Sequence, residues 1–457
     1  MTRIAYGLYP QALPADSNAT TRRDWLWQIY LVLIVVLLLW PDYAELKPGG
    51  LPNVSPVRLM RGLGIAAGLF FLFRDPARSE MFYRRVRENW GALIVLFAFY
   101  GFRVATIFVG HMEAQQLLFF VKYDFWSYLS MFFLTLLVVR DERDVRKVVQ
   151  VLVVAAAVIG LLAVLEFRLK RNLFQGIITV SNDFLMGVLR DKTRDNVYRA
   201  ESTFEHPIVL GQFFAMFLPC CWYVLRHGDT KWLRIIGGAA FVLGFVAIFT
   251  SGSRSALALA VPILVLMGMW EIWLWLKRSN NRPAQYLVML QFPLLLGIFG
   301  MVLYYLKNIA AGTTQETRGS ASVRMDMLYA GLHKIDSAML MGHGVGEATN
   351  VVTFVGTAGV RTLDNYYLVM ALESGLIGLG LNLLLWAFFY GRSLGFITDR
   401  NVDRSRIGVL LSLALLTHIA IMTIHALQSL TWLLMVLFAL ILILRERRRL
   451  APGPELK

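Results

Sequence analysis

The stretch that decides the fold runs from residue 232 to residue 276 and reads WLRIIGGAAFVLGFVAIF (232–249), TSGSRS (250–255) and ALALAVPILVLMGMWEIWLWL (256–276). Each apolar run is long enough to cross the roughly 30 Å hydrocarbon core of a bilayer as a helix. The small and polar residues between them predict a tight connection at the membrane boundary. Arg254 lies in this connection and is its only charged residue.

Apolar runs of this length recur along the whole chain. Hydrophobic residues make up 57% of the 457 positions, which predicts an all-α polytopic membrane protein rather than a soluble domain with one anchor. We predict about twelve transmembrane helices. They lie near residues 25–40, 57–73, 90–110, 116–139, 147–167, 207–225, 232–250, 255–276, 285–306, 365–390, 406–424 and 428–444.

The distribution of Lys and Arg predicts the orientation, because cytoplasmic loops keep an excess of these residues. The side that holds both termini has 27 of them and the opposite side has 16, of which 12 lie in two long loops. We therefore expect both termini in the cytoplasm and the two long loops outside. Topology then explains most of the net charge of +15, and no nucleic-acid partner is expected.

The chain is expected to form a single polytopic domain, residues 1–457, with two extracytoplasmic loops at 168–206 and 307–363. The second loop should contain an amphipathic helix, because its apolar residues recur at helical spacing opposite charged ones. The apolar residues are Val323, Met327, Leu328, Leu332 and Ile335, and the charged ones are Arg324, Asp326 and Lys334. Twelve-span transporters usually divide into two similar halves, and we find no such internal repeat.

Two arginines are candidates for holding an anion at the outer boundary. Arg254 is kept on the face whose short loops otherwise hold few cations, and its planar guanidinium suits a phosphate; snorkelling at a helix end is the simpler explanation. Arg199 stands near the end of the first long loop, where contact with solvent or lipid headgroups would also account for it. His206, directly before Pro207, is expected at a helix start rather than acting as a base.

A third group of candidates begins with Asp364-Asn365-Tyr366 at the start of the tenth predicted span. Asp364 and Asn365 can cap that helix, and Asp364 can alternatively accept a proton from a hydroxyl nucleophile. Glu373 lies deeper in the span, where a carboxylate is neutral, paired with a base or facing a polar cavity. His343 belongs to a glycine-rich turn, for which a catalytic part is the weaker interpretation.

Taken in order, these features resemble the bacterial O-antigen ligase and polymerase superfamily. The resemblance covers roughly residues 199–390 and rests on the following features: Arg199 with the Phe204–Pro207 segment, the connection 250–255, Arg324 leading an amphipathic helix, the turn 342–346, and Asn365 separated by nine residues from Gly375-Leu-Ile-Gly378. The ligase branch has a histidine immediately before the motif asparagine, whereas this chain has Asp364. The departure favours the polymerase branch.

The resemblance implies a metal-independent, inverting glycosyltransferase in the bacterial inner membrane, with its active site facing the periplasm and no cofactor. Its donor would be a polyprenyl-diphosphate-linked oligosaccharide and its acceptor a glycan, a lipid or a protein. Arg199 and Arg254 would hold the diphosphate, with Arg324 as a further candidate for the same group or for structural support, and Asp364 would act as the base. Asn365, Tyr366, His206, Glu373 and His343 would support them, and membrane lipids would surround the protein.

Three alternatives stay open at this point. A ligase would transfer the glycan to lipid A core, and a lipid-glycan flippase would also bind diphosphate through arginines. A twelve-span transporter is favoured if the intramembrane charges line one central pathway. Those charges are Arg103, Lys122, Asp124, Glu166 and Glu373.

Overall fold

The computed structural model describes residues 24–41, 43–46, 54–108, 113–174, 193, 196–279, 297, 315–353 and 363–450. Within these residues the fold is all-α and contains no strand, and an isolated bridge joins Leu46 and Val54. Nine of the described helices are long and apolar enough to cross a membrane. The predicted span at 285–306 lies outside the described residues, apart from Gly297.

The described residues of the first half of the chain form eight helical elements, in which one long span changes from π-helical to α-helical geometry. They are α1 (Trp25–Leu39), α2 (Pro56–Arg74), α3 (Pro76–Glu88), α4 (Trp90–Ile107), α5 (Glu113–Phe119), the π-helix η1 (Phe120–Leu129), α6 (Ser130–Val138) and α7 (Glu142–Leu169). The sequence predicts each span but not α3, whose arginines it assigns to a cytoplasmic loop. Nor does it predict the π-helix.

The second half supplies the central helices and the two short elements of the second long loop. They are α9 (Pro207–His227), α10 (Lys231–Thr250), α11 (Arg254–Ser279), α13 (Gln315–Ile335), the 3₁₀-helix η2 (Asp336–Ala338), α14 (Ala348–Val351), α15 (Tyr366–Leu394), α16 (Val402–Ile421) and α17 (Thr431–Leu450). The connection predicted at 250–255 is real, because α10 ends at Thr250 and α11 begins at Arg254.

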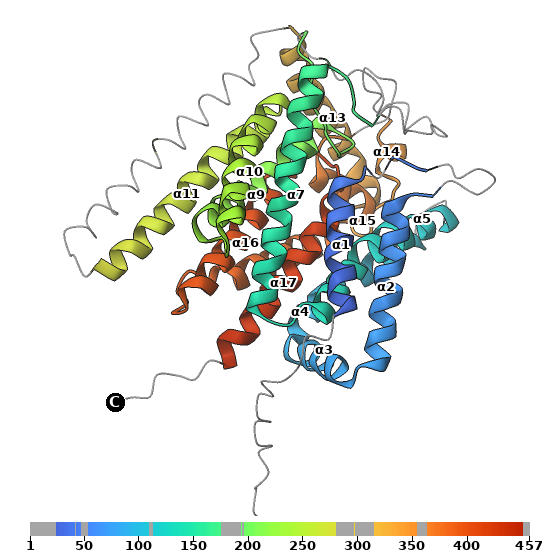
Figure 1. The fold of residues 1–457 in the computed structure, drawn as a ribbon. Coiled ribbons are helices and arrows are strands. Elements are labelled where there is room, and N and C mark those ends of the chain that lie inside the picture. Colours follow the sequence, from blue (N-terminus) through green and yellow to red (C-terminus); the bar gives the residue numbers. More distant parts are fainter. Residues whose placement is uncertain are drawn as a thin grey trace, which may run out of the picture.

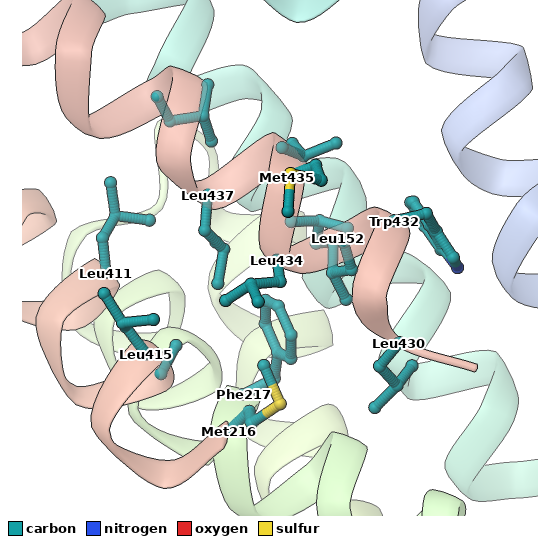
Figure 2. Packing of buried hydrophobic residues seen from close by; sticks show 14 of the residues in the cluster. Leu152, Met216, Phe217, Leu411, Leu415, Leu430, Trp432, Leu434, Met435 and Leu437 are labelled. Carbon is teal, nitrogen blue, oxygen red and sulfur yellow. The ribbon is translucent and has the colours of Figure 1, made fainter. Parts of the chain in front are cut away.

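The core centres on α17, α9 and α16. Between Leu433 and Leu444 every side chain of α17 is buried, which explains why this part of the helix is apolar on all sides. Figure 2 shows its residues among side chains of α7, α9 and α16, including Leu152, Phe217 and Leu411. The helices that carry the candidate site therefore stand on a closely packed centre.

Ion pairs gather the residues assigned to the cytoplasm at one end of the bundle. Glu446 near the end of α17 binds Arg84 and Arg85 of α3, and Arg404 at the start of α16 binds Glu142 at the start of α7. The elements of the second long loop, α13 and α14, lie at the opposite end from α3 (Figure 1). The two faces are thus separated as the charge pattern predicts, while the side that each faces in the cell stays a prediction.

A helix is present where the sequence predicts one in the second long loop, as α13, and four of its five predicted apolar residues contact one cluster. Met327 is buried, and Val323, Leu328 and Ile335 pack against the same cluster, which includes Leu368 of α15. Leu332 is 48% exposed and lies outside this cluster. Gly331 is the residue that meets α15 there, because a side chain at that position would clash with Leu368.

Candidate active site

The candidate base lies at the first turn of α15. Asn365 is the N-cap of this helix, and its Oδ1 accepts a hydrogen bond from the backbone N–H of Leu368 at 3.1 Å. Capping therefore accounts for Asn365 and not for Asp364, whose half-buried carboxylate accepts from Nε of Arg324 at 3.2 Å. The side chain of Asp364 is 37% exposed, so one arginine of α13 holds a carboxylate that a substrate can still reach.

Tyr366 anchors this turn from the inside. Its hydroxyl accepts from Nδ2 of Asn382 at 3.0 Å, and its ring stacks on Trp386 with 5.3 Å between centroids. Its backbone N–H donates to the carbonyl of Met422, in the connection between α16 and α17, at 3.1 Å. The structure thus places Tyr366 in the packing that orients the Asp364-Asn365 turn.

The helix α15 is broken at Gly375, a feature that the sequence reading does not predict. Gly375 adopts φ 64° and ψ −173°, so the intrahelical hydrogen bonds stop at this point. The freed carbonyls of Leu372 and Glu373 accept from the backbone N–H groups of His343 and Gly344 at 2.8 and 2.9 Å. The freed N–H of Leu376 donates to the carbonyl of Met339 at 2.8 Å. The turn 342–346 therefore completes the broken helix.

Glycine is required where these two segments meet. Gly342 has φ 74°, and a Cβ there would overlap the backbone of Glu373; a Cβ on Gly375 would overlap the carbonyl of Leu340. His343 contributes through its backbone, while its Nε2 lies 3.2 Å from the carbonyl of Lys334. The contacts of His343 agree with its assignment to a glycine-rich turn.

Glu373 belongs to a buried ion network below the turn. Arg103 of α4 lies 3.3 Å from the carboxylate of Glu373 and 3.1 Å from that of Asp124 in η1. Lys122 instead lies over the ring of Tyr123, 4.9 Å from its centroid. Since Glu166 binds a different segment, the five intramembrane charges do not line one pathway, which removes the condition for the transporter alternative.

Arg199 lies directly on the connection between α10 and α11. Its Nε donates to the carbonyl of Ser251 at 2.8 Å, and the backbone N–H of Ala200 donates to that of Thr250 at 3.0 Å. Gly252, at φ 58°, leaves room for the arginine, because a Cβ there would lie 3.1 Å from its Nε. Arg254 follows as the half-buried first residue of α11. Two arginines far apart in the sequence are thus brought to one short connection.

Glu166, near the end of α7, holds the backbone that carries Arg199. Its fully buried carboxylate accepts from the Tyr198 hydroxyl at 2.9 Å and from the backbone N–H groups of Glu201 and Ser202 at 3.2 and 2.6 Å. Sequence reasoning considered Glu166 only as a transporter charge. The sequence does contain a signal for this role: Glu166 is a carboxylate three residues before the end of the apolar helix α7, which leads into the loop that carries Arg199.

His206 starts α9, as expected. It is the N-cap, and its Nδ1 accepts from the backbone N–H of Ile208 at 3.1 Å, with Pro207 as the first helical residue. Nearby, the Ser429 hydroxyl donates to the Glu205 carboxylate. Ser429 and Met422 both lie in the connection between α16 and α17, and the carbonyl of Met422 accepts from Tyr366 in the first turn of α15. Residues 422–430 therefore link the segment that leads into α9 to the turn that carries Asp364.

A cavity of about 540 Å³ lies at the other end of α9, lined by Trp222, Arg226, Glu271 and Arg406 among others. The 21 residues of α9 separate it from His206 by about 30 Å. Of its two arginines, Arg406 is balanced by acidic neighbours, since it lies 3.5 Å from Glu271 and 3.6 Å from Asp403. This cavity is therefore separate from the candidate site.

Comparison with known proteins agrees with the resemblance seen in the sequence. The family model described as O-antigen ligase matches residues 239–383, about a third of the chain. The matched segment begins in α10 and ends in α15, and so includes Arg254, Arg324, the turn 342–346, Asp364 and Gly375. No curated protein matches the chain. The match supports membership of the O-antigen ligase and polymerase superfamily, and with it a membrane enzyme of surface polysaccharide assembly.

Proposed function

We propose that this chain, which carries the domain of the O-antigen ligase family, is a membrane glycosyltransferase that polymerises polyprenyl-diphosphate-linked glycan units on the outer face of the inner membrane. The observation that carries the proposal is the pair of Asp364 and Arg324, which leaves a reachable carboxylate at the same end of the bundle as Arg199 and the 250–255 connection. A flippase has no need of such a base.

In the proposed reaction Asp364 accepts the proton of an acceptor hydroxyl. The hydroxyl oxygen attacks the anomeric carbon of the donor with inversion, and the bond from that carbon to the lipid diphosphate breaks. Arg199 and Arg254 stabilise the negative charge that develops on the departing diphosphate, since fixed guanidinium groups near a low-dielectric boundary need little reorganisation. Arg324 orients the carboxylate and can also meet the diphosphate. The charge on the leaving group is balanced without a metal.

Purified protein supplied with lipid-linked oligosaccharide, without added metal, should lengthen the glycan, as a ladder of products in mass spectrometry. Asp364→Asn keeps the size of the side chain and removes the base, so turnover should fall by about 10²- to 10⁴-fold while donor binding remains. Asp326→Asn, an exposed carboxylate of the same helix as Arg324, is the matched control and should stay active. Full activity of Asp364→Asn would exclude Asp364 as the base.

The diphosphate role of the arginines needs a separate measurement. Arg254→Ala should weaken binding of the lipid-linked donor, whereas Arg58→Ala, on the same predicted face with a side chain that is 57% exposed, should not. Normal donor binding by Arg254→Ala would contradict the proposed clamp.

A ligase that transfers glycan to lipid A core is the second candidate, because the matched family is described as O-antigen ligase. The two are told apart by the product. Polymerisation leaves the lengthened glycan on its lipid diphosphate, whereas ligation moves it to a core acceptor present in the same reaction. Product formed only with the core acceptor would replace the polymerase proposal with the ligase.

A further inference from the structure

The connection between α16 and α17, residues 422–430, holds a histidine for which neither the sequence motifs nor the proposed mechanism gives a role. This connection is fixed on two sides, by the hydrogen bond from Tyr366 to Met422 and by that from Ser429 to Glu205. It therefore lies between the first turn of α15 and the segment that leads into α9. His425 stands in the middle of it.

The imidazole of His425 is buried but only half satisfied. Its side chain is 1% exposed, and Nδ1 accepts the backbone N–H of Leu427 at 3.2 Å. With Nδ1 as the acceptor, the neutral ring carries its proton on Nε2. Nε2 is buried without a hydrogen-bond partner among the described residues. An unpaired buried donor of this kind is unfavourable, so an acceptor at Nε2 would stabilise the site.

The segment of His425 packs against the elements that carry the proposed base. Its neighbour Ala426 contacts the cluster that contains Met327 of α13 and Leu363 and Leu368, which lie on either side of Asp364 in the sequence. Burial and the nearby Arg324 guanidinium lower the pKa of His425 to about 4, so the ring is neutral at neutral pH. The same Arg324 holds the carboxylate of Asp364. The guanidinium of Arg324 in α13 thus binds the carboxylate of Asp364, two residues before α15, and acts electrostatically on the neutral imidazole of His425 in the α16–α17 connection.

We propose that His425 is an acceptor-binding residue, whose Nε2–H donates to an oxygen of the acceptor saccharide that Asp364 activates. The inference rests on the proposed function. A neutral donor suits a sugar hydroxyl or ring oxygen, whereas the diphosphate has charged guanidinium groups available to it. Sequence motifs do not reveal this residue, because it lies far along the chain from Asn365 and only the fold brings it beside Arg324.

The test uses the full-length purified enzyme, unlabelled lipid-linked oligosaccharide as donor and the same oligosaccharide on a fluorescent lipid as acceptor. Only lengthened fluorescent product is scored, so that the concentration of each substrate can be varied separately. His425→Phe keeps a ring and removes the donor, whereas His425→Gln keeps an N–H near the position of Nε2. The loss of one hydrogen bond predicts a rise of about tenfold in the acceptor KM of His425→Phe, with the donor KM within about twofold of wild type.

His425→Gln should recover most of the affinity for the acceptor. An unchanged acceptor KM in His425→Phe would overturn the inference, as would a rise in donor KM instead, which would make His425 a diphosphate ligand. If the Phe and Gln variants showed equal rises in acceptor KM together with equal falls in melting temperature, His425 would be a packing residue and the inference would be overturned. If the wild-type enzyme forms no product, the proposed function has failed, and this is distinct from an active enzyme whose KM values do not respond.

Discussion

Glu166 and Glu373 are both buried carboxylates at the candidate-site end of the bundle, and the structure satisfies them in opposite ways. Glu166 accepts three hydrogen bonds from neutral donors, two of them backbone N–H groups of the Arg199 loop. Glu373 faces the guanidinium of Arg103, which it shares with Asp124. Sequence alone groups the two as costly intramembrane charges.

The difference shows what each carboxylate does. Glu166 fixes a loop, because its partners are the side chain of Tyr198, just before Arg199, and the backbone N–H groups of Glu201 and Ser202, just after it. Glu373 fixes the relation between helices, because its partners lie on α4 and, through Arg103, on η1. A buried charge can therefore mark either the position of a functional side chain or the packing beneath it, and only the identity of its partners separates the two.

The largest effect should come from removing the cation of the Glu373 network. Arg103→Met leaves Asp124 and Glu373 buried without compensation, which costs about 3–5 kcal/mol of folding free energy. Thermal unfolding of the purified protein in detergent would measure the loss. The triple variant Arg103→Met, Asp124→Asn, Glu373→Gln removes all three charges together and should recover much of the stability. A single variant as stable as wild type would mean that the network contributes little.

A smaller effect is expected from Glu166→Gln. The oxygen of the glutamine amide can accept hydrogen bonds from only some of the three donors. We therefore expect the free energy of unfolding to fall by about 1–3 kcal/mol. Because the carboxylate positions Arg199, donor binding should weaken more than acceptor binding, which a general loss of stability would not produce. Glu80→Gln, exposed on α3, is the control. Equal changes in both binding constants would contradict the positioning role.

The smallest effect is expected at His343. His343→Ala keeps the backbone N–H that binds Leu372, so its stability should stay within about 0.5 kcal/mol of wild type. Gly342→Ala provides the contrast, because it places a Cβ against the Glu373 backbone at a positive φ. If His343→Ala were as damaging as Gly342→Ala in the same unfolding measurement, the side chain rather than the backbone would be the functional part of the turn.

The spans could be predicted from the sequence because each is a long apolar run bounded by polar residues, and this pattern follows directly from the bilayer. The π-helix η1 and the break at Gly375 could not, because both depend on backbone hydrogen bonds rather than hydropathy. Helix α3 was missed because its many arginines resemble a cytoplasmic loop. They form an amphipathic surface helix instead, with Arg85 buried against Glu446.

The candidate site shows the same division. The sequence brought forward Arg199, Arg254 and Asp364 because each is a charge at a membrane boundary. It offered Arg324 as a further diphosphate ligand or as structural support, and the structure pairs Arg324 with the carboxylate of Asp364. The sequence marks Glu166 as a buried charge but does not indicate its role, and it does not indicate His425. The partners of both residues are distant in the sequence, and one apolar or connecting segment resembles another.

The break in α15 also explains why the spacing between Asn365 and Gly375 matters. Ten residue steps of 100° turn the helix by about 2.8 turns, so the cap and the break have a fixed angular phase. One inserted residue between them would rotate Asp364 by about 100° about the helix axis and raise it by about 1.5 Å, relative to the turn 342–346. The number of residues between Gly375, inside the membrane, and Asp364 therefore determines the direction in which the carboxylate points at the surface.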